Sequence, residues 1–275
     1  MSVISASMTI VGTGLEIIDL QDDRAFLARP TRFRDVTGMP EGMRRIAHAL
    51  IEHPETVLQV LVETAVEVCG ADSSAISLEK EDRTEEAWYH WVAIAGEYSP
   101  MYNAVFPHYP TGCSVCLERG RPQHVRASKK YFDLLGITAR PVTDGLMFPW
   151  QTDMERGTLY ILAHERKQAF DKSDLRIMEI LADFVAIGVR QLRQQKQLLR
   201  QAGLLAEAAM ANKLAHNINN PLQSLINILY LASEGHYGEG AVIVGNQALC
   251  DLERLSSLVR ELLSLPRGSD AQALL

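Results

Sequence analysis

Hydrophobic residues recur at three- and four-residue steps between residues 41 and 70. This period is typical of a helix with one buried face, and a glycine such as Gly70 often follows the last helical turn. Residues 1–38 lack a clean period and are interrupted by Pro30 and Gly38. We therefore predict helical structure over residues 41–70, preceded by an N-terminal extension with partial structure. The periodic positions are Ile46, Ala49, Leu50, Val57, Val60, Leu61, Ala65 and Val68.

Two pairs of short segments have the composition of β-strands. The first pair, SSAISLEK (73–80) and AWYHWVAIAG (87–96), is separated by a charged turn. The second pair, DGLMFPWQ (144–151) and RGTLYILAHE (156–165), is joined by a short polar turn. Both pairs are rich in β-branched and aromatic residues, which favours strands.

Short helical segments complete this part of the chain. A helix is predicted between Gly112 and Gly120, and Asp171 is a suitable N-cap for a later, longer helix. The order is therefore helix, two strands, small helices, two strands and long helix. This order favours an α+β domain in which an antiparallel sheet has its helices segregated to one side.

Beyond residue 189 the sequence favours long helices. A narrow apolar stripe near heptad spacing needs a partner, most simply the same helix of a second subunit. Residues 233–240 (SEGHYGEG) form a glycine-rich turn, and residues 241–265 form a second amphipathic helix. We predict an all-α helical hairpin that pairs with a second copy to form a dimeric four-helix bundle. The positions near heptad spacing are Val189, Leu192, Leu199, Ala206 and Lys213.

Composition narrows the class of protein. The formal net charge is -7, which argues against a generally basic nucleic-acid-binding surface. The chain has no run of about 18 uncharged apolar residues and no convincing signal peptide, so we expect no membrane span. The four cysteines are unevenly spaced, which is typical of reduced thiols. We expect a soluble cytoplasmic protein.

Residues 39–192 resemble a GAF domain, the small-molecule-sensing module of signalling proteins. The resemblance depends on the order and spacing of three segments. They are ETVLQVLVETAVEVCGADSSAISL, GCSVCLERGRPQHV and GLMFPWQTDMERGTLYILAHERKQAFDKSDLRIMEILADFVAIGV. It implies a pocket for an unknown small-molecule ligand. The chain lacks a convincing bilin-attachment motif, so we expect no chromophore and no other cofactor bound by this chain.

Two features near the expected pocket are candidate ligand contacts. Trp88 and His90 alternate with Val92 and Ile94 on one strand face, which either lines the pocket or packs in an ordinary sheet. Ordinary sheet packing is the preferred explanation. The opposite face carries Tyr89 and Trp91.

Cys113 and Cys116 form a C-x-x-C at the start of the predicted short helix. One such pair without further ligands is weak evidence for zinc, so we expect no metal site. A redox pair favoured by the helix dipole is the chemical alternative. The preferred explanation is two small buried residues at the loop-to-helix junction.

The stretch LAHNINNPL (214–222) breaks the rules for a helix interior, because it combines three asparagines with a proline. With QSL after it, it resembles the H-box of sensor histidine kinases. The resemblance implies that His216 is the phosphoacceptor, Asn220 the polar residue one turn on, and Pro221 the first residue of the helix-bending pair. Asn220 lies at i+4 and should share the face of His216.

The match departs from the family at two points. Asn217 stands where the family usually has an acid, and an amide cannot accept a proton from the imidazole. We therefore expect weak or absent attack on ATP, while transfer from a receiver aspartyl phosphate stays open. The chain also ends about where a kinase would begin its ATP-binding domain. Either it is a truncated kinase or it receives phosphate in trans, so enzyme activity stays uncertain.

These observations predict a two-component phosphorelay protein of histidine-kinase type. Expected partners are a second copy of the chain and a receiver domain or partner histidine kinase. The alternative is a dimeric scaffold without phosphoryl chemistry. The basic residues Arg190, Arg193, Lys196 and Arg200 are expected on a solvated helix face. The expected boundaries are an extension (1–38), GAF sensor (39–192), signalling helix (193–213), phosphoacceptor hairpin (205–266) and tail (267–275).

Overall fold

A computed structural model describes residues 7–9, 12–31, 38–84 and 87–233. Beyond these it describes only positions 243, 246–248, 250, 252–255 and 257. The chain divides into two compact units, residues 1–195 and 196–275. Each unit is described by itself.

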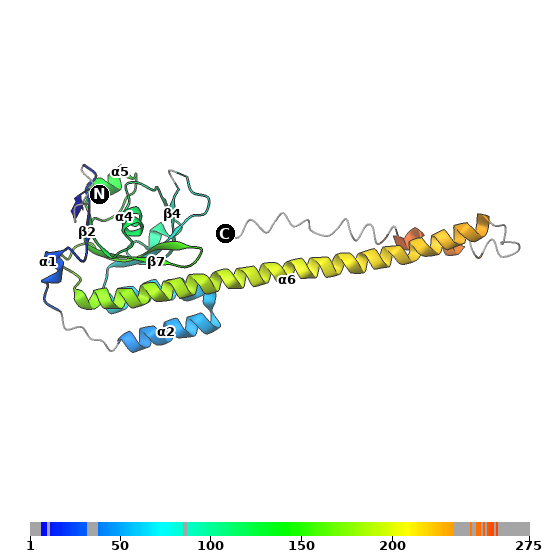
Figure 1. The fold of residues 1–275 in the computed structure, drawn as a ribbon, viewed down its shortest axis with the longest axis horizontal. Helices are drawn as coiled ribbons and strands as arrows, with labels where there is room; N and C mark the ends of the chain where they lie inside the picture. The colour runs from blue at the N-terminus through cyan, green and yellow to red at the C-terminus, as the bar shows by residue number, and fades with distance from the viewer. Residues whose placement is uncertain are drawn as a thin grey trace. The chain divides into compact units, whose positions relative to one another are not determined.

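The first unit is built on one eight-stranded antiparallel sheet (Figure 1). The strand order is β1-β2-β6-β7-β8-β3-β4-β5, so neighbours in the sheet are often far apart in the sequence. The strands are β1 (Ser7–Thr9), β2 (Leu15–Asp19), β3 (Ser73–Glu79), β4 (Tyr89–Gly96), β5 (Val105–Phe106), β6 (Gln123–Ala127), β7 (Val142–Gln151) and β8 (Arg156–Ala163).

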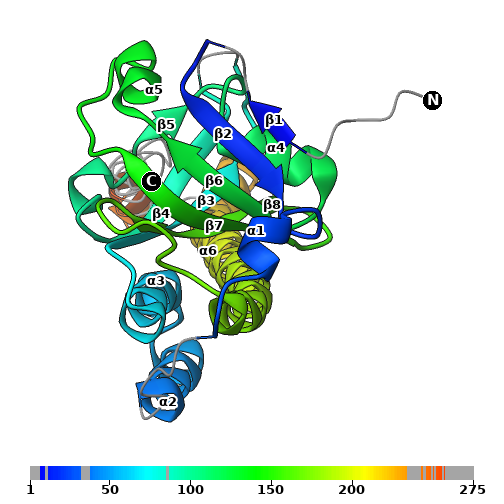
Figure 2. The same ribbon diagram turned by 90° about the vertical axis from the view of Figure 1, so that its left-hand side faces the viewer.

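Helices cover both faces of this sheet (Figure 2). The helix α3 (Val57–Cys69) and the first turns of α6 (Lys172–Ser233) lie on one face, with α2 (Gly38–Glu52) packed against α3. The other face carries α4 (Gly112–Arg119) and α5 (Lys129–Leu134). The remaining elements are α1 (Arg24–Leu27) and two short 3-10 turns, η1 (Pro54–Thr56) and η2 (Ser99–Met101).

Two hydrophobic clusters follow from this layering. The first contains buried apolar residues of α3 and α6, such as Leu61 and Met178, packed on the sheet. The second lies on the α4 and α5 side and is unusually aromatic, with Trp91, Tyr98 and Tyr160 in ring contact. Burial of this apolar surface is the main stabilising contribution to the unit.

The predicted secondary structure is confirmed in most of this unit. All four predicted strands are present within a few residues of their expected bounds. Gly70 ends α3 in the left-handed conformation, with φ of 57°. Asp171 accepts a hydrogen bond from the amide of Ser173 at 2.7 Å and so caps α6. The expectation of helices on one side is wrong, because α4 and α5 cover the opposite face from α3.

The N-terminal extension contributes more to the sheet than its sequence indicated. β2 pairs with β6 from Leu15 opposite Ala127 to Asp19 opposite Gln123. Leu15 and Ile17 are buried in the aromatic cluster. The segment thus covers the edge that β6 would otherwise expose.

In residues 196–275, the described helix continues to Ser233 and contains Pro221. Of the predicted turn (233–240), Ser233 is the last residue of α6 and the rest lies outside the described residues, as do the tail and most of the second predicted helix. The helical hairpin and the four-helix bundle therefore stay predictions. No helix within the described positions is both long and apolar enough to cross a membrane.

Two members of the predicted basic helix face have acidic partners. Arg190 lies 3.2 Å from Asp153, and Arg193 lies 3.5 Å from Glu155. Both acids belong to the turn between β7 and β8 or its edge. The solvated-face prediction is therefore incomplete for these two residues, although exposed pairs of this kind contribute little stability.

Candidate functional site

The aromatic cluster encloses a cavity of about 70 Å³. Its walls come from β2, β4, β5, β6, β7 and β8 of the sheet and from α4 and α5. A space of this size can accommodate water or a ligand of a few heavy atoms. The lining residues are Leu15, Trp91, Tyr98, Phe106, Thr111, Gly112, Cys113, Val125, Ala127, Tyr131, Phe132, Val142, Met147, Tyr160 and Leu162.

Two polar groups of this lining lack hydrogen-bond partners. Neither the hydroxyl of Tyr160 nor the indole nitrogen of Trp91 is bonded to another described residue, although both atoms are buried. Burial raises the pKa of Tyr160 well above its ordinary value, so its hydroxyl keeps its proton. A buried donor without a partner costs about 1–3 kcal/mol. Tyr160 and Trp91 are therefore two lining residues whose buried donors are unsatisfied among the described residues.

Cys113 lies in the first turn of α4 and lines this cavity. Its sulfur accepts a hydrogen bond from the hydroxyl of Thr158 at 3.3 Å. Burial raises the pKa of Cys113, and burial together with Cys113 raises that of Cys116 further. Both thiols are therefore neutral, and neutral thiols are poor metal ligands and poor nucleophiles. This favours the packing interpretation; oxidation of the pair stays a prediction.

Trp88 and His90 lie outside the cavity lining, contrary to the expected alternation. Ile76 of β3 pairs with Ala93, but Ser77 pairs with Trp91. Val92 is therefore an extra residue that reverses the alternation, so that Trp91 and Ile94 join the same aromatic cluster. A bulge of this kind has no sequence signal in the strand.

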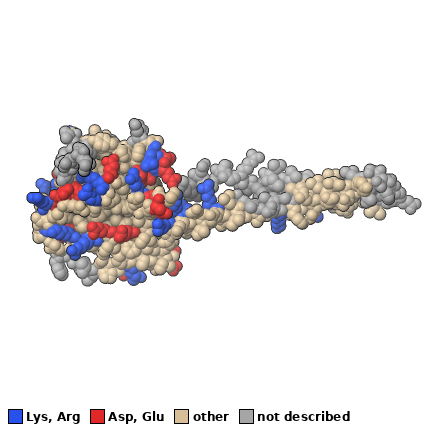
Figure 3. Space-filling model, in the orientation of Figure 1, with Lys and Arg blue, Asp and Glu red and all other residues tan. Residues whose placement is uncertain are grey.

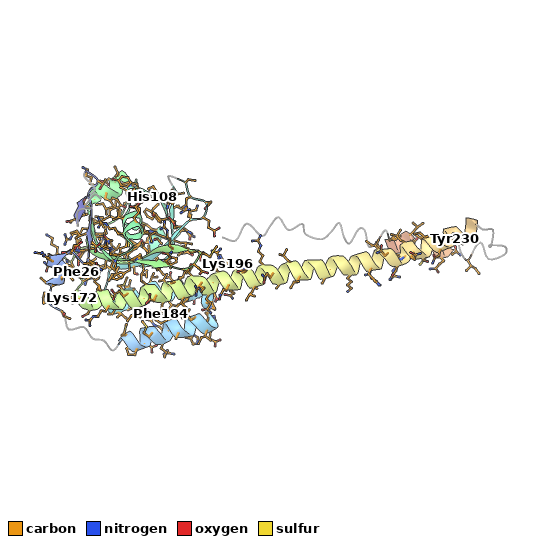
Figure 4. The ribbon with its side chains drawn as sticks, in the orientation of Figure 1. Phe26, His108, Lys172, Phe184, Lys196 and Tyr230 are labelled. Carbon is orange, nitrogen blue, oxygen red and sulfur yellow. The ribbon has the colours of Figure 1, made fainter. Side chains whose placement is uncertain are left out.

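Other contacts engage these two side chains. The indole nitrogen of Trp88 donates to Glu79 at 2.9 Å, and His90 lies 3.2 Å from the side-chain oxygen of Asn103. The ring of Trp88 also contacts that of His108, with centroids 4.3 Å apart and planes tilted by 48°; Figure 4 labels His108 on the α4 side of the sheet. Their predicted role in ligand binding has no support from the cavity's geometry.

A buried ionic network lies at the other face of β6 and β7. Nδ1 of His124 is 2.6 Å from Asp23, and Nε2 is 2.7 Å from Asp144. Arg29 donates to both oxygens of Asp144, at 2.8 and 2.9 Å. At most 9% of any of these four residues is exposed. Both ring nitrogens of His124 face carboxylates, so a doubly protonated imidazole satisfies both contacts.

The carboxylates of this network are held ionised. Burial by itself would raise the pKa of Asp144, but hydrogen bonds from His124 and Arg29 hold it well below its ordinary value. The same holds for Asp23, where the Phe26 amide and His124 outweigh burial. The sequence analysis missed this network, because β6 and α1 were not predicted. The polar Asp144 at the head of an apolar strand was the available signal.

His216 lies on α6, and the structure brings it together with Asn220. The side-chain nitrogen of Asn220 is 3.4 Å from Nδ1 of His216, and both side chains are exposed. The two asparagine amide atoms are interchangeable in such an assignment, so either can face the ring. Asn217, the neighbour of His216 in sequence, takes no part in this contact. The face predicted from the i+4 spacing is therefore present.

Charges of both signs are interleaved on the face of residues 1–195 shown in Figure 3. Several form surface ion pairs, such as Arg140 with Glu97 at 3.1 Å. Among the described residues no group of three His, Cys, Asp or Glu side chains is placed to hold a metal ion.

The sequence model of the GAF domain matches residues 52–190, which is half of the chain. The chain belongs to the GAF domain family. GAF domains are sensory and regulatory modules of signalling proteins. No curated protein matched the sequence.

Solved GAF domains share low sequence identity with this GAF protein. The GAF domain of an Acinetobacter phosphoenolpyruvate-protein phosphotransferase is 13% identical, covering 57% of this chain and 96% of that chain, with a TM-score of 0.46. The GAF-B domain of DevS from Mycobacterium smegmatis is 19% identical, covering 53% and 98%, with a TM-score of 0.41. A phycoerythrobilin-bound GAF domain from a cyanobacterial phytochrome is 13% identical, covering 59% and 100%, with a TM-score of 0.44.

Proposed function

We propose that this GAF protein is a two-component signalling protein of histidine-kinase type, in which His216 receives a phosphoryl group in trans. The observation that carries the proposal is the contact between His216 and Asn220 on a helix that also contains Pro221. A surface histidine on such a helix, with an amide on the same face, provides an exposed nucleophile with a partner for its second nitrogen.

The transfer step follows from this geometry. With its amide oxygen turned toward the ring, Asn220 accepts a hydrogen bond from Nδ1–H, which keeps the proton on Nδ1 and leaves the lone pair on Nε2. Nε2 attacks the phosphorus of an aspartyl phosphate on a receiver domain. The N–P bond forms as the P–O bond breaks, and the aspartate leaves as a carboxylate. An acid at position 217 is not needed for this leaving group.

The cavity supplies the sensory input in this proposal. Trp91 and Tyr160 each hold a donor without a described partner in a largely apolar lining, so the ligand class is a small molecule with a hydrogen-bond acceptor. The ligand shifts the packing of α6, which contains residues of both units. The protein acts as a homodimer in the cytoplasm, and its partner is a receiver domain or a histidine kinase.

The test is transfer of labelled phosphate from a phosphorylated receiver to the purified chain. We expect label on the wild type and none on His216→Ala, while an Asn212→Ala control on the same helix keeps it. Absence of label from the wild type, or equal label on His216→Ala, contradicts the proposal.

A scaffold function is the second candidate, and Asn217 favours it because the acid needed for attack on ATP is missing. In that case the chain binds a kinase or receiver and remains dimeric but is never phosphorylated. Sedimentation of the unlabelled protein with the receiver measures whether the chain is still dimeric and still binds the receiver. A dimer that binds supports the scaffold function, and a chain that does neither has lost all function.

A further inference from the structure

The segment from residue 12 to residue 31, here called the strap, lies outside the region matched by the GAF family. It contains β2 and α1. Leu15 of the strap lines the cavity, and Ile17 is fully buried in the same cluster. The strap therefore forms one wall of the cavity.

The strand β2 lies near one margin of the sheet. Its outer neighbour is β1, a terminal strand of three residues, and short edge strands contribute few hydrogen bonds. At the opposite margin the two-residue terminal strand β5 lines the cavity through Phe106. Of these two marginal walls, β2 is the one whose segment also contacts the peptide before α6, through Arg29.

Two charged residues fasten the strap to the sheet. Asp23 bonds His124 of β6, and Arg29 bonds Asp144 of β7. These four side chains, here called the latch, place two carboxylates against the Arg29 guanidinium and the His124 ring. A complete buried set gives little net stability, because opening returns the charges to water and recovers their desolvation cost. Such contacts position the strap and still allow it to open.

The latch also holds the peptide that precedes α6. Arg29 donates to the carbonyl of Phe170 at 2.7 Å, and the amide of Phe170 donates to Asp144 at 3.1 Å. Phe170 lies two residues before the first residue of α6, Lys172, and Figure 4 shows Lys172 and Phe26 of the strap at the same end of the sheet. Loss of the strap removes the Arg29 contact and leaves Asp144 with fewer partners.

The strand β6 joins the cavity to the latch directly. Val125 and Ala127 of this strand line the cavity, and His124 belongs to the latch. Successive side chains of a strand point to opposite faces, so a displacement of β6 or of its partner β2 is felt at both sites.

We propose that the strap is the gate of the cavity, and that its opening releases the start of α6. Because the latch joins the strap to the peptide before α6, opening of the strap couples ligand entry to this helix. This inference depends on the proposed function only in taking the cavity as the ligand site, because the gate itself exists in the ligand-free protein.

Cysteine labelling tests the gate in the full-length chain. Cys113 faces the cavity, whereas Cys69 is buried in the other cluster, on α3. Opening of the strap exposes only Cys113, whereas global unfolding exposes both. The exposed Cys250 is first replaced by serine, and alkylation by iodoacetamide is followed at each cysteine by fragment mass spectrometry.

The test variant is Arg29→Met, and Arg24→Met on the exposed side of α1 is its matched control. We expect Arg29→Met to accelerate labelling of Cys113 about tenfold or more while Cys69 stays at the wild-type rate. Arg24→Met should change neither rate. An unchanged rate at Cys113, or equal acceleration at both cysteines, overturns the gate.

Asp23→Asn serves as the second variant should Arg29→Met fail to fold. Asparagine keeps the cap of α1, where Asp23 accepts from the amide of Phe26 at 2.9 Å, but removes the charge that faces His124. For this variant too, labelling of Cys113 should accelerate while labelling of Cys69 stays at the wild-type rate.

Hydrogen exchange of the same proteins tests the link to α6. We expect faster exchange in residues 15–19 and in residues 172–178, with residues 73–79 unchanged. Faster exchange in β2 with a protected α6 overturns the link, and faster exchange in α5 without β2 assigns the gate to α5 instead. These experiments use no phosphodonor. They therefore test the gate whether or not His216 accepts a phosphoryl group.

Discussion

The carboxylate of Asp144 accepts a hydrogen bond from the amide of Phe170 at 3.1 Å, across 26 positions of the sequence. This contact joins β7, a wall of the cavity, to the residue two positions before α6. A buried carboxylate at this point connects the sensory domain to the helix that leaves it.

Replacement of Asp144 by asparagine should lower the free energy of unfolding by about 3 kcal/mol or more, because it leaves Arg29 buried without its charged partner. Urea denaturation measures this change. The same substitution at the exposed Asp22 is the control and should have little effect. Equal stabilities for the two variants would show that the network contributes nothing.

Removal of the unpartnered hydroxyl of Tyr160 should not lower the free energy of unfolding, unlike the substitution of Asp144. Tyr160→Phe should leave the ligand-free protein as stable as the wild type or more stable by about 1 kcal/mol, because it removes a buried donor that lacks an acceptor. Tyr98→Phe should destabilise, because the hydroxyl of Tyr98 donates to the carbonyl of Arg140. Thermal unfolding compares the two. A clear loss of stability in Tyr160→Phe contradicts the expectation and indicates a bound occupant.

Glu79 should make stability depend on acid pH. Burial would raise the pKa of this carboxyl, but hydrogen bonds from Arg156 and Trp88 lower it to about 2 in the folded chain, from an ordinary value of 4.5. Its stabilising effect is complete above the ordinary value and is lost as the pH falls toward the folded value.

Melting temperatures of the wild type and Glu79→Gln, measured across this range, test the effect. The wild type should be the more stable at neutral pH, and the difference should shrink as the pH approaches 2. A difference that does not vary with pH contradicts the assignment.

A substitution at position 217 should increase the rate at which His216 is phosphorylated. Asn217→Glu restores the acid that the histidine-kinase family usually has, so a partner kinase should phosphorylate His216 about tenfold faster or more, within the range of general-base effects. Asn217→Gln is the control of equal size without the charge and should match the wild type. Initial rates of label incorporation measure both, and equal rates for the two variants would exclude a role for the acid.

Most of the secondary structure of the sensory domain was predictable, because its strands and helices have clear hydrophobic periods. The strand β2 and the latch were not, because Leu15 and Asp23 are fixed by partners about a hundred residues away. The bulge at Val92 was not predictable either, and it brings Ile94 to the same cluster as Trp91 although the two were expected on opposite strand faces. By contrast, the contact of His216 with Asn220 followed from local helical spacing.

The central claim is that the cavity controls phosphoryl transfer at His216. Ala127→Leu fills the cavity from β6, and Ala47→Leu makes the same change on the exposed side of α2. The decisive measurement is the rate of phosphoryl transfer from a phosphorylated receiver to His216 in these two variants and the wild type. We expect Ala127→Leu to change the rate about fivefold or more and Ala47→Leu to leave it unchanged. Transfer at one rate in all three proteins would contradict it.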